Sequence, residues 1–223
     1  EQCGSERALL CIMLAKLQKM DPDVIVGHNI AGFDLEVLMH RMQACKAPQW
    51  HRVGRLRRGT FPKLGAPGQS GFGSGPSPML LSCVSGRLLC DTYLGAKELL
   101  NSEVSYSLKA LAENKLGESK IDMPPSDVQR SFDTAEGLVR LAESGVKDSW
   151  LSLAMMFYLN QLPLTRQQTA LCGNVWSKTL SGQRAQRIEY LLLHEFHMRK
   201  HLVPDRLPKA ERERVAKAAG MKK

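Results

Sequence analysis

The residue with the clearest potential for chemistry is Asp34, which lies at the junction of two predicted elements. The apolar run 24–26 predicts a buried strand covered on both faces, and a helical pattern of apolar residues starts at Phe33. Mg²⁺ prefers hard oxygen ligands, so a carboxylate at such a junction is a candidate metal ligand. A structural role is the alternative, because an acid in the first turn of a helix gains roughly 0.3–1 kcal/mol from the helix dipole.

Three further polar residues lie beside this junction or at a similar one. Asn29 is in the predicted turn, where asparagine tolerates left-handed backbone or bonds its own backbone. We expect His28 to satisfy backbone groups beside the turn, and Asp91, after a second apolar run, to be structural. Phosphodiester hydrolysis by two metal ions needs a cluster of carboxylates, which these residues alone do not supply.

The spacing Asn29-x-x-x-Phe33-Asp34 resembles the second exonuclease motif of the family B DNA polymerases. That resemblance implies an α/β fold, a partial RNase H-like (3′-5′ exonuclease-like) domain followed by a helical segment. The family's third motif aligns with residues 144–148, where Asp148 is present but Ser144 stands in the tyrosine position. The first motif, Asp-x-Glu on a strand, has no candidate and would lie upstream of residue 1. We therefore expect Asp34, Ser144 and Asp148 to be vestigial positions, with no catalytic residue and no bound metal here.

The resemblance covers nearly the whole chain, with further similar segments at 46–65, 86–91, 105–108 and 162–205. It implies a replicative, DNA-directed DNA polymerase that extends primers made by primase in the nucleus. The implied partners are template-primer DNA, and primase and accessory subunits that contact regions outside this chain. The palm motifs that hold the polymerase's Mg²⁺ are absent and would lie downstream, so this chain is not expected to extend primers by itself. The resemblance implies that the exonuclease-like domain is kept as a scaffold with its nuclease activity lost. Because the chain lacks an initiator Met, we expect it to be a fragment.

Basic residues are concentrated in two segments of this chain, whose net charge is +9. Residues 46–68 and 199–223 each carry +6, which leaves −3 for the remainder. Such segments indicate contact with a polyanion, although charge runs are also common in solvated loops and tails. The predicted DNA-backbone contacts are Arg52, Arg55, Arg57, Arg58 and Lys63.

Composition excludes several classes of protein. No apolar run is long enough to cross a membrane, and we expect no membrane partner. The six cysteines are scattered without C-x-x-C spacing, which excludes the common zinc and thioredoxin motifs and favours a reducing compartment.

The pattern of elements predicts three regions. Residues 1–161 would form the exonuclease-like domain without its N-terminal strands, 162–205 a helical segment that links to the N-terminal and palm regions, and 206–223 a basic tail. Helices are expected at 5–20, 33–44, 95–100, 107–116, 134–143, 147–161, 165–180 and 184–199, and a second strand at 86–91. A long loop is expected at 46–82, a proline-containing loop at 122–127, and a break at Leu162–Pro163.

Three other functions stay open on the sequence. The chain could belong to the exonuclease domain of a proofreading family B polymerase, if an upstream Asp-x-Glu exists and Ser144 is tolerated. A free-standing nuclease would have no need of segment 162–205. A pure interaction module would use the basic tail to bind protein or RNA.

Overall fold

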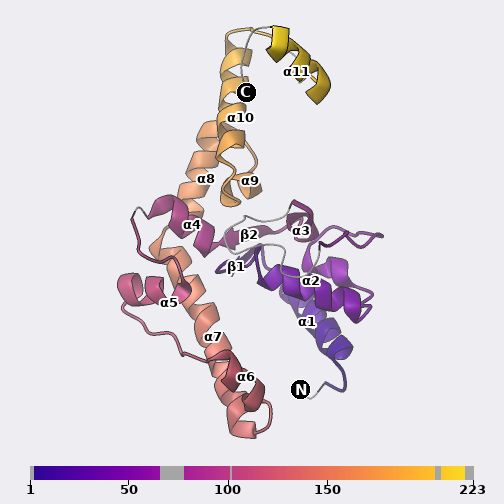
Figure 1. Ribbon diagram of the computed structural model, residues 1–223, viewed down its shortest axis with the longest axis vertical. Helices are drawn as coiled ribbons and strands as arrows, with labels where there is room; N and C mark the ends of the chain where they lie inside the picture. Colours follow the sequence, from indigo (N-terminus) through magenta and orange to yellow (C-terminus); the bar gives the residue numbers. More distant parts are fainter. Residues whose placement is uncertain (1–2, 66–77, 101, 204–206, 219–223) are drawn as a thin grey trace.

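The computed structural model describes residues 3–65, 78–100, 102–203 and 207–218, and its centre is a pair of parallel strands (Figure 1). These strands are β1 (Val24–Gly27) and β2 (Leu88–Asp91), with Val24 opposite Leu88 and Gly27 opposite Asp91. Because the strands run in the same direction, the residues after Gly27 and after Asp91 emerge at one edge of the sheet. The residues before Val24 and before Leu88 lie at the other edge.

Two helices, α1 (Glu6–Met20) and α2 (Asp34–Ala44), form the layer on one side of the sheet (Figure 1). The hydroxyl of Ser5 caps α1 by accepting a hydrogen bond from the Ala8 amide at 3.2 Å. Leu14 of α1 and Met39 of α2 are fully buried in one apolar cluster, which anchors both helices.

The crossover from α2 to β2 contains η1 (Trp50–Val53) and α3 (Pro78–Cys83). The prediction of a loop over 46–82 is wrong for part of this segment, because Trp50 and Val53 are buried in the cluster of α1 and α2. The Trp50 ring also lies 4.7 Å from the ring of Phe61. A single 3₁₀ turn places both apolar side chains on one face, a spacing too short to give a periodic signal. Residues 66–77 of the predicted loop lie outside the described residues.

The chain after β2 is helical and leads to a long helix, α7, that packs on β1 (Figure 1). The predicted break around Ser144 is wrong: Gly145 has open space around it, and one glycine costs a helix only about 1 kcal/mol. The predicted loop 122–127 is shorter, since a helix starts at Pro125, a position whose missing N–H is tolerated. The helices are α4 (Thr92–Leu99), α5 (Leu108–Leu111), the π turn η2 (Ala112–Leu116), α6 (Pro125–Ser131) and α7 (Ala135–Tyr158).

The last third of the described chain forms a helical arm that rises from the sheet (Figure 1). The predicted break at Pro163 is wrong, because this proline lies in the first turn of α8, where amides have no helical partner. The chain instead turns at Asn160, whose φ is 47°. Gly173, with φ 68°, divides the predicted helix 165–180 in two. The helices are α8 (Gln161–Cys172), α9 (Trp176–Leu180), α10 (Arg184–Met198) and α11 (Lys209–Ala218).

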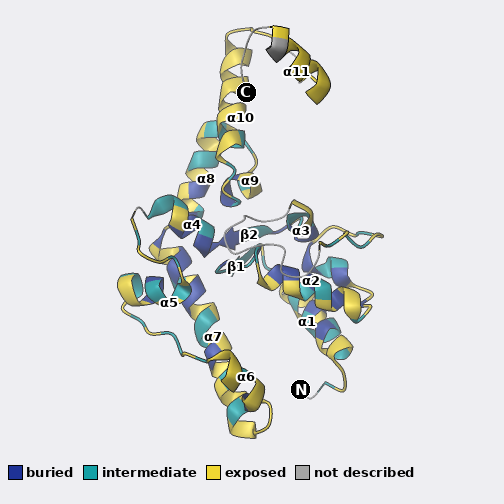
Figure 2. Ribbon diagram, viewed as in Figure 1, coloured by how far each residue is buried: buried dark blue, intermediate teal, exposed yellow. Residues whose placement is uncertain are grey.

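Burial falls steeply along this arm (Figure 2). Leu180 of α9 is buried with Cys90 of β2 and Met156 of α7, so α9 joins the core of the α/β unit. In contrast, α10 has no buried residue. The predicted boundaries at 161/162 and 205/206 stay predictions, and residues 204–206 and 219–223 lie outside the described residues.

The strand β1 is less covered than its sequence predicted. All four of its residues are partly exposed, so the expectation of burial on both faces is wrong. An apolar groove of about 480 Å³ runs between α1, α2 and the sheet, with Ile25 and Leu89 in its floor. No helix among the described ranges is long and apolar enough to span a membrane.

The packing predicts a large difference between two leucines of α1. Leu14 is fully buried, whereas Leu9 is 54% exposed. Leu14→Ala should lower the free energy of unfolding by about 2–4 kcal/mol through lost burial and a cavity. Leu9→Ala should lower it by less than about 1 kcal/mol. Urea unfolding followed by circular dichroism measures both, and equal losses would contradict the packing of α1.

Candidate functional site

The motif Asn29-x-x-x-Phe33-Asp34 forms a tight turn between β1 and α2. Asn29 has φ 58°, and its carbonyl accepts hydrogen bonds from the amides of Gly32 at 3.1 Å and Phe33 at 3.0 Å. A Cβ on Gly32 would lie only 2.6 Å from Oδ1 of Asn29, so a larger residue there would displace the Asn29 side chain. The predicted left-handed turn at Asn29 is confirmed.

Asp91 holds the two strand ends together. It is buried at 3% exposure, and its Oδ1 accepts from the Asn29 amide at 2.8 Å and from the Tyr93 amide at 3.0 Å. It thereby caps α4 and pins the turn after β1. Burial raises the pKa of its carboxyl, while the backbone amides act in the opposite direction. These contacts are those expected of a structural residue, which is the role predicted for Asp91.

His28 ties a distant segment to the same edge of the sheet. Its Nδ1 lies 3.0 Å from the Thr92 hydroxyl and its Nε2 lies 3.0 Å from the Tyr106 carbonyl oxygen. A neutral ring donates Nε2–H to Tyr106, and its Nδ1 shares the single proton of the Thr92 hydroxyl with the Gly27 carbonyl oxygen, which lies 3.2 Å from that hydroxyl. Burial lowers the pKa of His28 to about 4, and the nearby charge of Lys120 contributes in the same direction. The ring therefore bonds backbone and hydroxyl groups beside the turn, as predicted.

Asp34 is the first residue of α2, as predicted, and it stands at the rim of the apolar groove. Asp34 is exposed to solvent on one side. Apolar side chains on the other side desolvate its carboxyl group and raise the pKa of that group. No ion pair or side-chain hydrogen bond to Asp34 is present among the described residues. The geometry is that of a helix-start carboxylate.

Ser144 and Asp148 lie one turn apart on α7, and the segment that follows η2 covers them. The Ser144 hydroxyl donates to the Ile121 carbonyl oxygen at 3.4 Å. Lys120 places its Nζ 2.8 Å from Oδ2 of Asp148, and Lys147 places its Nζ 2.6 Å from Oε2 of Glu118. We call residues 118–122 the cover, and two ion pairs and one hydrogen bond hold it on α7.

These residues do not fit a divalent metal. Within the described ranges, no group of three or more His, Cys, Asp or Glu side chains is arranged to hold an ion. Asp148 is paired with an ammonium group, and its Oδ1 is buried without a hydrogen-bond partner in the described structure. A carboxylate neutralised by lysine has lost most of its attraction for a metal cation.

The predicted DNA-contacting residues lie at the opposite edge of the sheet, and they are not equivalent. Arg55 is engaged with Asp21 and Asp23, at 2.9 and 2.7 Å. Arg58 donates to the Ser82 hydroxyl at 2.9 Å. The other three, Arg52, Arg57 and Lys63, have no ion pair or side-chain hydrogen bond in the described part of the chain.

Sequence reasoning missed Lys120 and Arg87. Glu118 and Lys120 of the cover complement Lys147 and Asp148 of α7, but nothing in the local sequence indicates that these segments meet. Arg87 directly precedes β2, and its side chain is 1% exposed. A charged residue before an apolar strand was a usable signal for a group at the sheet edge.

Comparisons with known proteins all find DNA polymerases of family B. The DNA polymerase family B exonuclease domain matches residues 1–111. DNA polymerase alpha catalytic subunits are similar over most of this chain. The rice protein (Oryza sativa) is 52% identical over 93% of the chain, and the mouse protein (Mus musculus) is 41% identical over 92%. The chain spans about 14% of the rice protein and 13% of the mouse protein.

A solved structure shares the fold. The family B DNA polymerase of the archaeon Pyrobaculum calidifontis superposes with a TM-score of 0.69 at 24% identity, over 94% of this chain and 26% of that one. The predicted α/β fold class is confirmed.

The environment of His28 predicts a specific pH dependence. Its folded pKa, about 4, is below the usual 6.5, so folding favours the neutral ring. This contribution is fully present above pH 6.5 and is lost as the pH falls toward 4, by up to about 3 kcal/mol. The destabilisation caused by His28→Gln should therefore shrink between pH 7 and 4 in urea unfolding. The control is His201→Gln, because His201 is exposed. If His28→Gln lowered the free energy of unfolding equally at pH 7 and pH 4, a neutral, buried His28 would be contradicted.

Proposed function

Because the chain belongs to the family B DNA polymerases and has the fold of their exonuclease domain, we propose that it is a scaffold domain that does not cleave DNA. The observation that carries this proposal is the ion pair between Lys120 and Asp148. A nuclease of this class needs carboxylates free to bind metal, and here the third-motif position holds a lysine cation instead. Ser144 adds support, since its hydroxyl is bonded to the cover.

The parent protein, in this proposal, is a DNA polymerase alpha catalytic subunit. It would be a DNA-directed DNA polymerase in the nucleus that extends primers made by primase, with primase and accessory subunits bound elsewhere. Its Mg²⁺ would be held by residues outside this chain. The similarity of the named relatives over more than nine-tenths of the chain supports this proposal.

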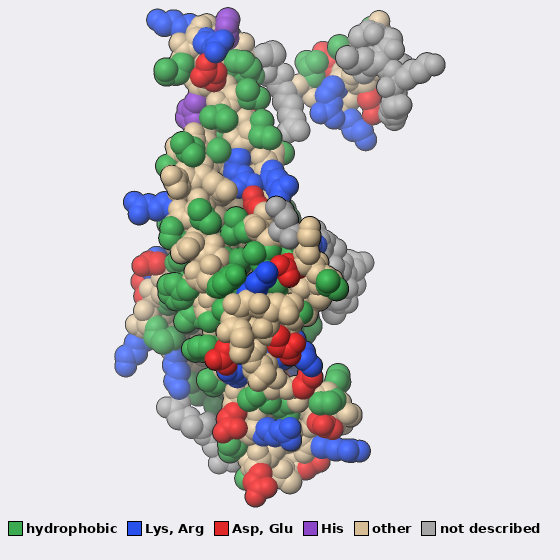
Figure 3. Space-filling model, turned by 90° about the vertical axis from the view of Figure 1, so that its left-hand side faces the viewer, with side chains coloured by type: hydrophobic (Ala, Val, Ile, Leu, Met, Phe, Trp, Pro, Cys, Tyr) green, Lys and Arg blue, Asp and Glu red, His purple; other side chains and the backbone are tan. Residues whose placement is uncertain are grey.

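We propose that the helical arm attaches this domain to the rest of the parent polymerase. Apolar side chains of α10 are exposed along its length and join those of α8 on the surface of the arm (Figure 3). A soluble domain rarely exposes such a stripe unless something covers it. We assign the rest of the parent chain as the covering partner. The exposed positions of α10 are Ile188, Tyr190, Leu191, Leu192, Leu193, Phe196 and Met198.

A nuclease assay on the parent polymerase tests the scaffold role. Labelled single-stranded DNA with Mg²⁺ should be digested no faster by the parent than by its Asp34→Ala variant. Both should match a Lys120→Ala variant, because freeing Asp148 from the lysine does not replace the tyrosine whose position Ser144 occupies. Digestion by the parent that Asp34→Ala abolishes would reject the proposal in favour of a proofreading exonuclease.

A substitution in α10 tests the attachment. Leu192 is 46% exposed, so Leu192→Glu should change the unfolding midpoint of the isolated chain very little. In the parent polymerase the same charge would be buried without a partner and should lower the melting temperature by several degrees. Gln186→Glu on the same helix is the control. An unchanged melting temperature of the Leu192→Glu parent would remove α10 as an attachment face.

A further inference from the structure

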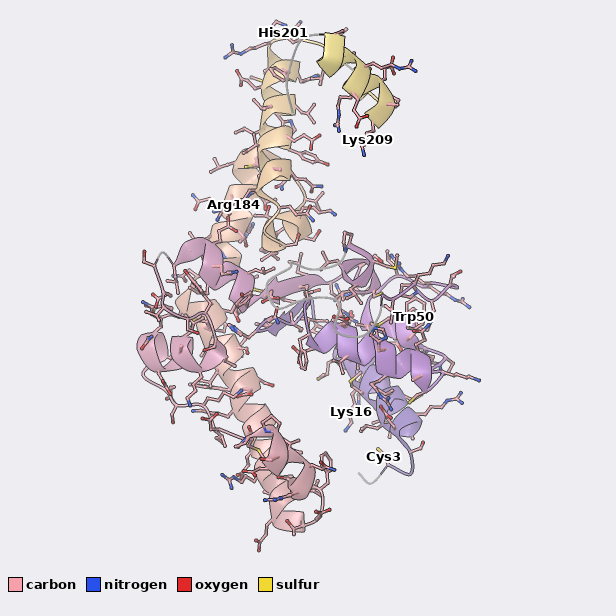
Figure 4. The ribbon with its side chains drawn as sticks, in the orientation of Figure 1. Cys3, Lys16, Trp50, Arg184, His201 and Lys209 are labelled. Atoms are coloured by element: carbon pink, nitrogen blue, oxygen red, sulfur yellow. The ribbon has the colours of Figure 1, made fainter. Side chains whose placement is uncertain are left out.

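A polar cleft of about 670 Å³ opens at the edge of the sheet opposite Asp34 and Asp91. Its walls come from the end of α1, from η1 and the residues after it, and from the segment before β2. Trp50 marks the position of η1, to the right of the sheet, whereas α4 lies to its left (Figure 4). The cleft is therefore separate from the exonuclease-like edge, and its size falls within the usual range of ligand sites.

The base of the cleft is a rigid, internally neutralised network. Arg87 is buried and donates to Asp21 Oδ1 at 2.8 Å and to the Val53 carbonyl oxygen at 3.2 Å. Arg55 donates to the same oxygen of Asp21 at 2.9 Å and contacts Asp23 at 2.7 Å. Hydrogen bonds from Arg55 and Arg87 lower the pKa of Asp21, so its carboxylate stays ionised and paired. The two acids are thus already matched by two arginines.

The rim of the cleft carries positive charge that nothing in the described structure offsets. Arg52 and Arg57 line it without an ion pair or a side-chain hydrogen bond to any described residue. His51 and Gln49 line it as well and add hydrogen-bonding groups. Arginine side chains held on a packed 3₁₀ turn and on the residues that follow it suit oxyanions, because the guanidinium group offers several donors in one plane.

We propose that this cleft binds backbone phosphates of a nucleic-acid strand, with Arg52 and Arg57 as the contacting residues. This inference rests on the proposed function, since it gives the scaffold a strand-holding role. Arg55 positions the rim and does not contact the strand, because its Nε, Nη1 and Nη2 already donate inside the protein. Arg58 donates to the Ser82 hydroxyl and does not line the cleft, so it is not assigned a contact.

Two features favour a nucleic acid over an acidic protein segment. A strand presents phosphates at regular intervals, so neighbouring phosphates can contact Arg52 and Arg57. The cleft also offers no apolar seat for a peptide side chain, because Trp50 and Val53 are turned into the core. No Phe, Tyr or Trp is among the described residues that line this cleft, so phosphate contacts should dominate binding and give no sequence preference.

The test is a salt titration of oligonucleotide binding by this chain. A fluorescent, mixed-sequence, single-stranded DNA is titrated with the chain and with its Arg52→Gln/Arg57→Gln variant. Loss of two phosphate contacts should reduce the slope of log K against log salt by about 1.4 and weaken binding roughly tenfold near 100 mM salt. The matched control, Arg130→Gln/Arg140→Gln, removes the same charge from exposed positions on α6 and α7 and should leave the slope unchanged.

Three outcomes would overturn the proposal. They are no binding by the unaltered chain at low salt, equal losses in both double variants, and displacement of the DNA by an acidic phosphopeptide at lower concentration than by unlabelled DNA. Circular dichroism must show that the variants are folded, which the lack of internal partners for Arg52 and Arg57 leads us to expect. The nuclease assay on the parent is a separate test. A failure of the chain to bind DNA would not contradict the scaffold role, and nuclease activity of the parent would not contradict binding of DNA by the cleft.

Discussion

The carboxylate of Asp91 is the contact on which the exonuclease-like edge depends. One oxygen accepts the amide that starts the turn after β1 and the amide that starts α4. The backbone carbonyl of the same residue accepts from Nε2 of Gln161, a side chain that is 1% exposed, at 3.0 Å. Gly95 permits this approach, since a Cβ there would lie 2.5 Å from the Gln161 amide group. A single residue therefore joins β1, β2, α4 and the start of the arm.

The proposed scaffold role requires that a nuclease framework can persist without nuclease chemistry. The turn that presents Asp34 is held by the backbone of Asn29 and by the carboxylate of Asp91, contacts that need no metal. The third-motif position is under no such constraint from the sheet. There the cover supplies Lys120, whose ammonium group pairs with Oδ2 of Asp148 and leaves Oδ1 without a hydrogen-bond partner among the described residues. The ion pair also secures the cover against α7, together with Lys147 and Glu118.

The sequence predicted what local periodicity and turn chemistry control, and it failed where tertiary contacts decide. The helix at 6–20, both strands and the turn at Asn29 were predicted because apolar spacing and backbone preferences specify them. A helix break was predicted at Pro163 because proline disrupts the interior of a helix. The residue lies instead in the first turn of α8, where proline is tolerated. The role of Lys120 could not be predicted, because its partner Asp148 lies 28 residues away in the sequence. The two residues meet only because the cover packs on α7.

The polarity of a parallel sheet gives its two edges different chemistry. At the C-terminal edge, backbone amides and a buried carboxylate satisfy one another, and the adjacent acids are paired or stand alone. At the N-terminal edge, Arg55 and Arg87 are matched by Asp21 and Asp23, and the arginines beyond them are not matched. In the proposed scaffold role, loss of metal chemistry at one edge would place no constraint on charge at the other. A domain of this kind could keep a strand-binding surface at its N-terminal edge, since the charged groups of the two edges make no contact with each other among the described residues.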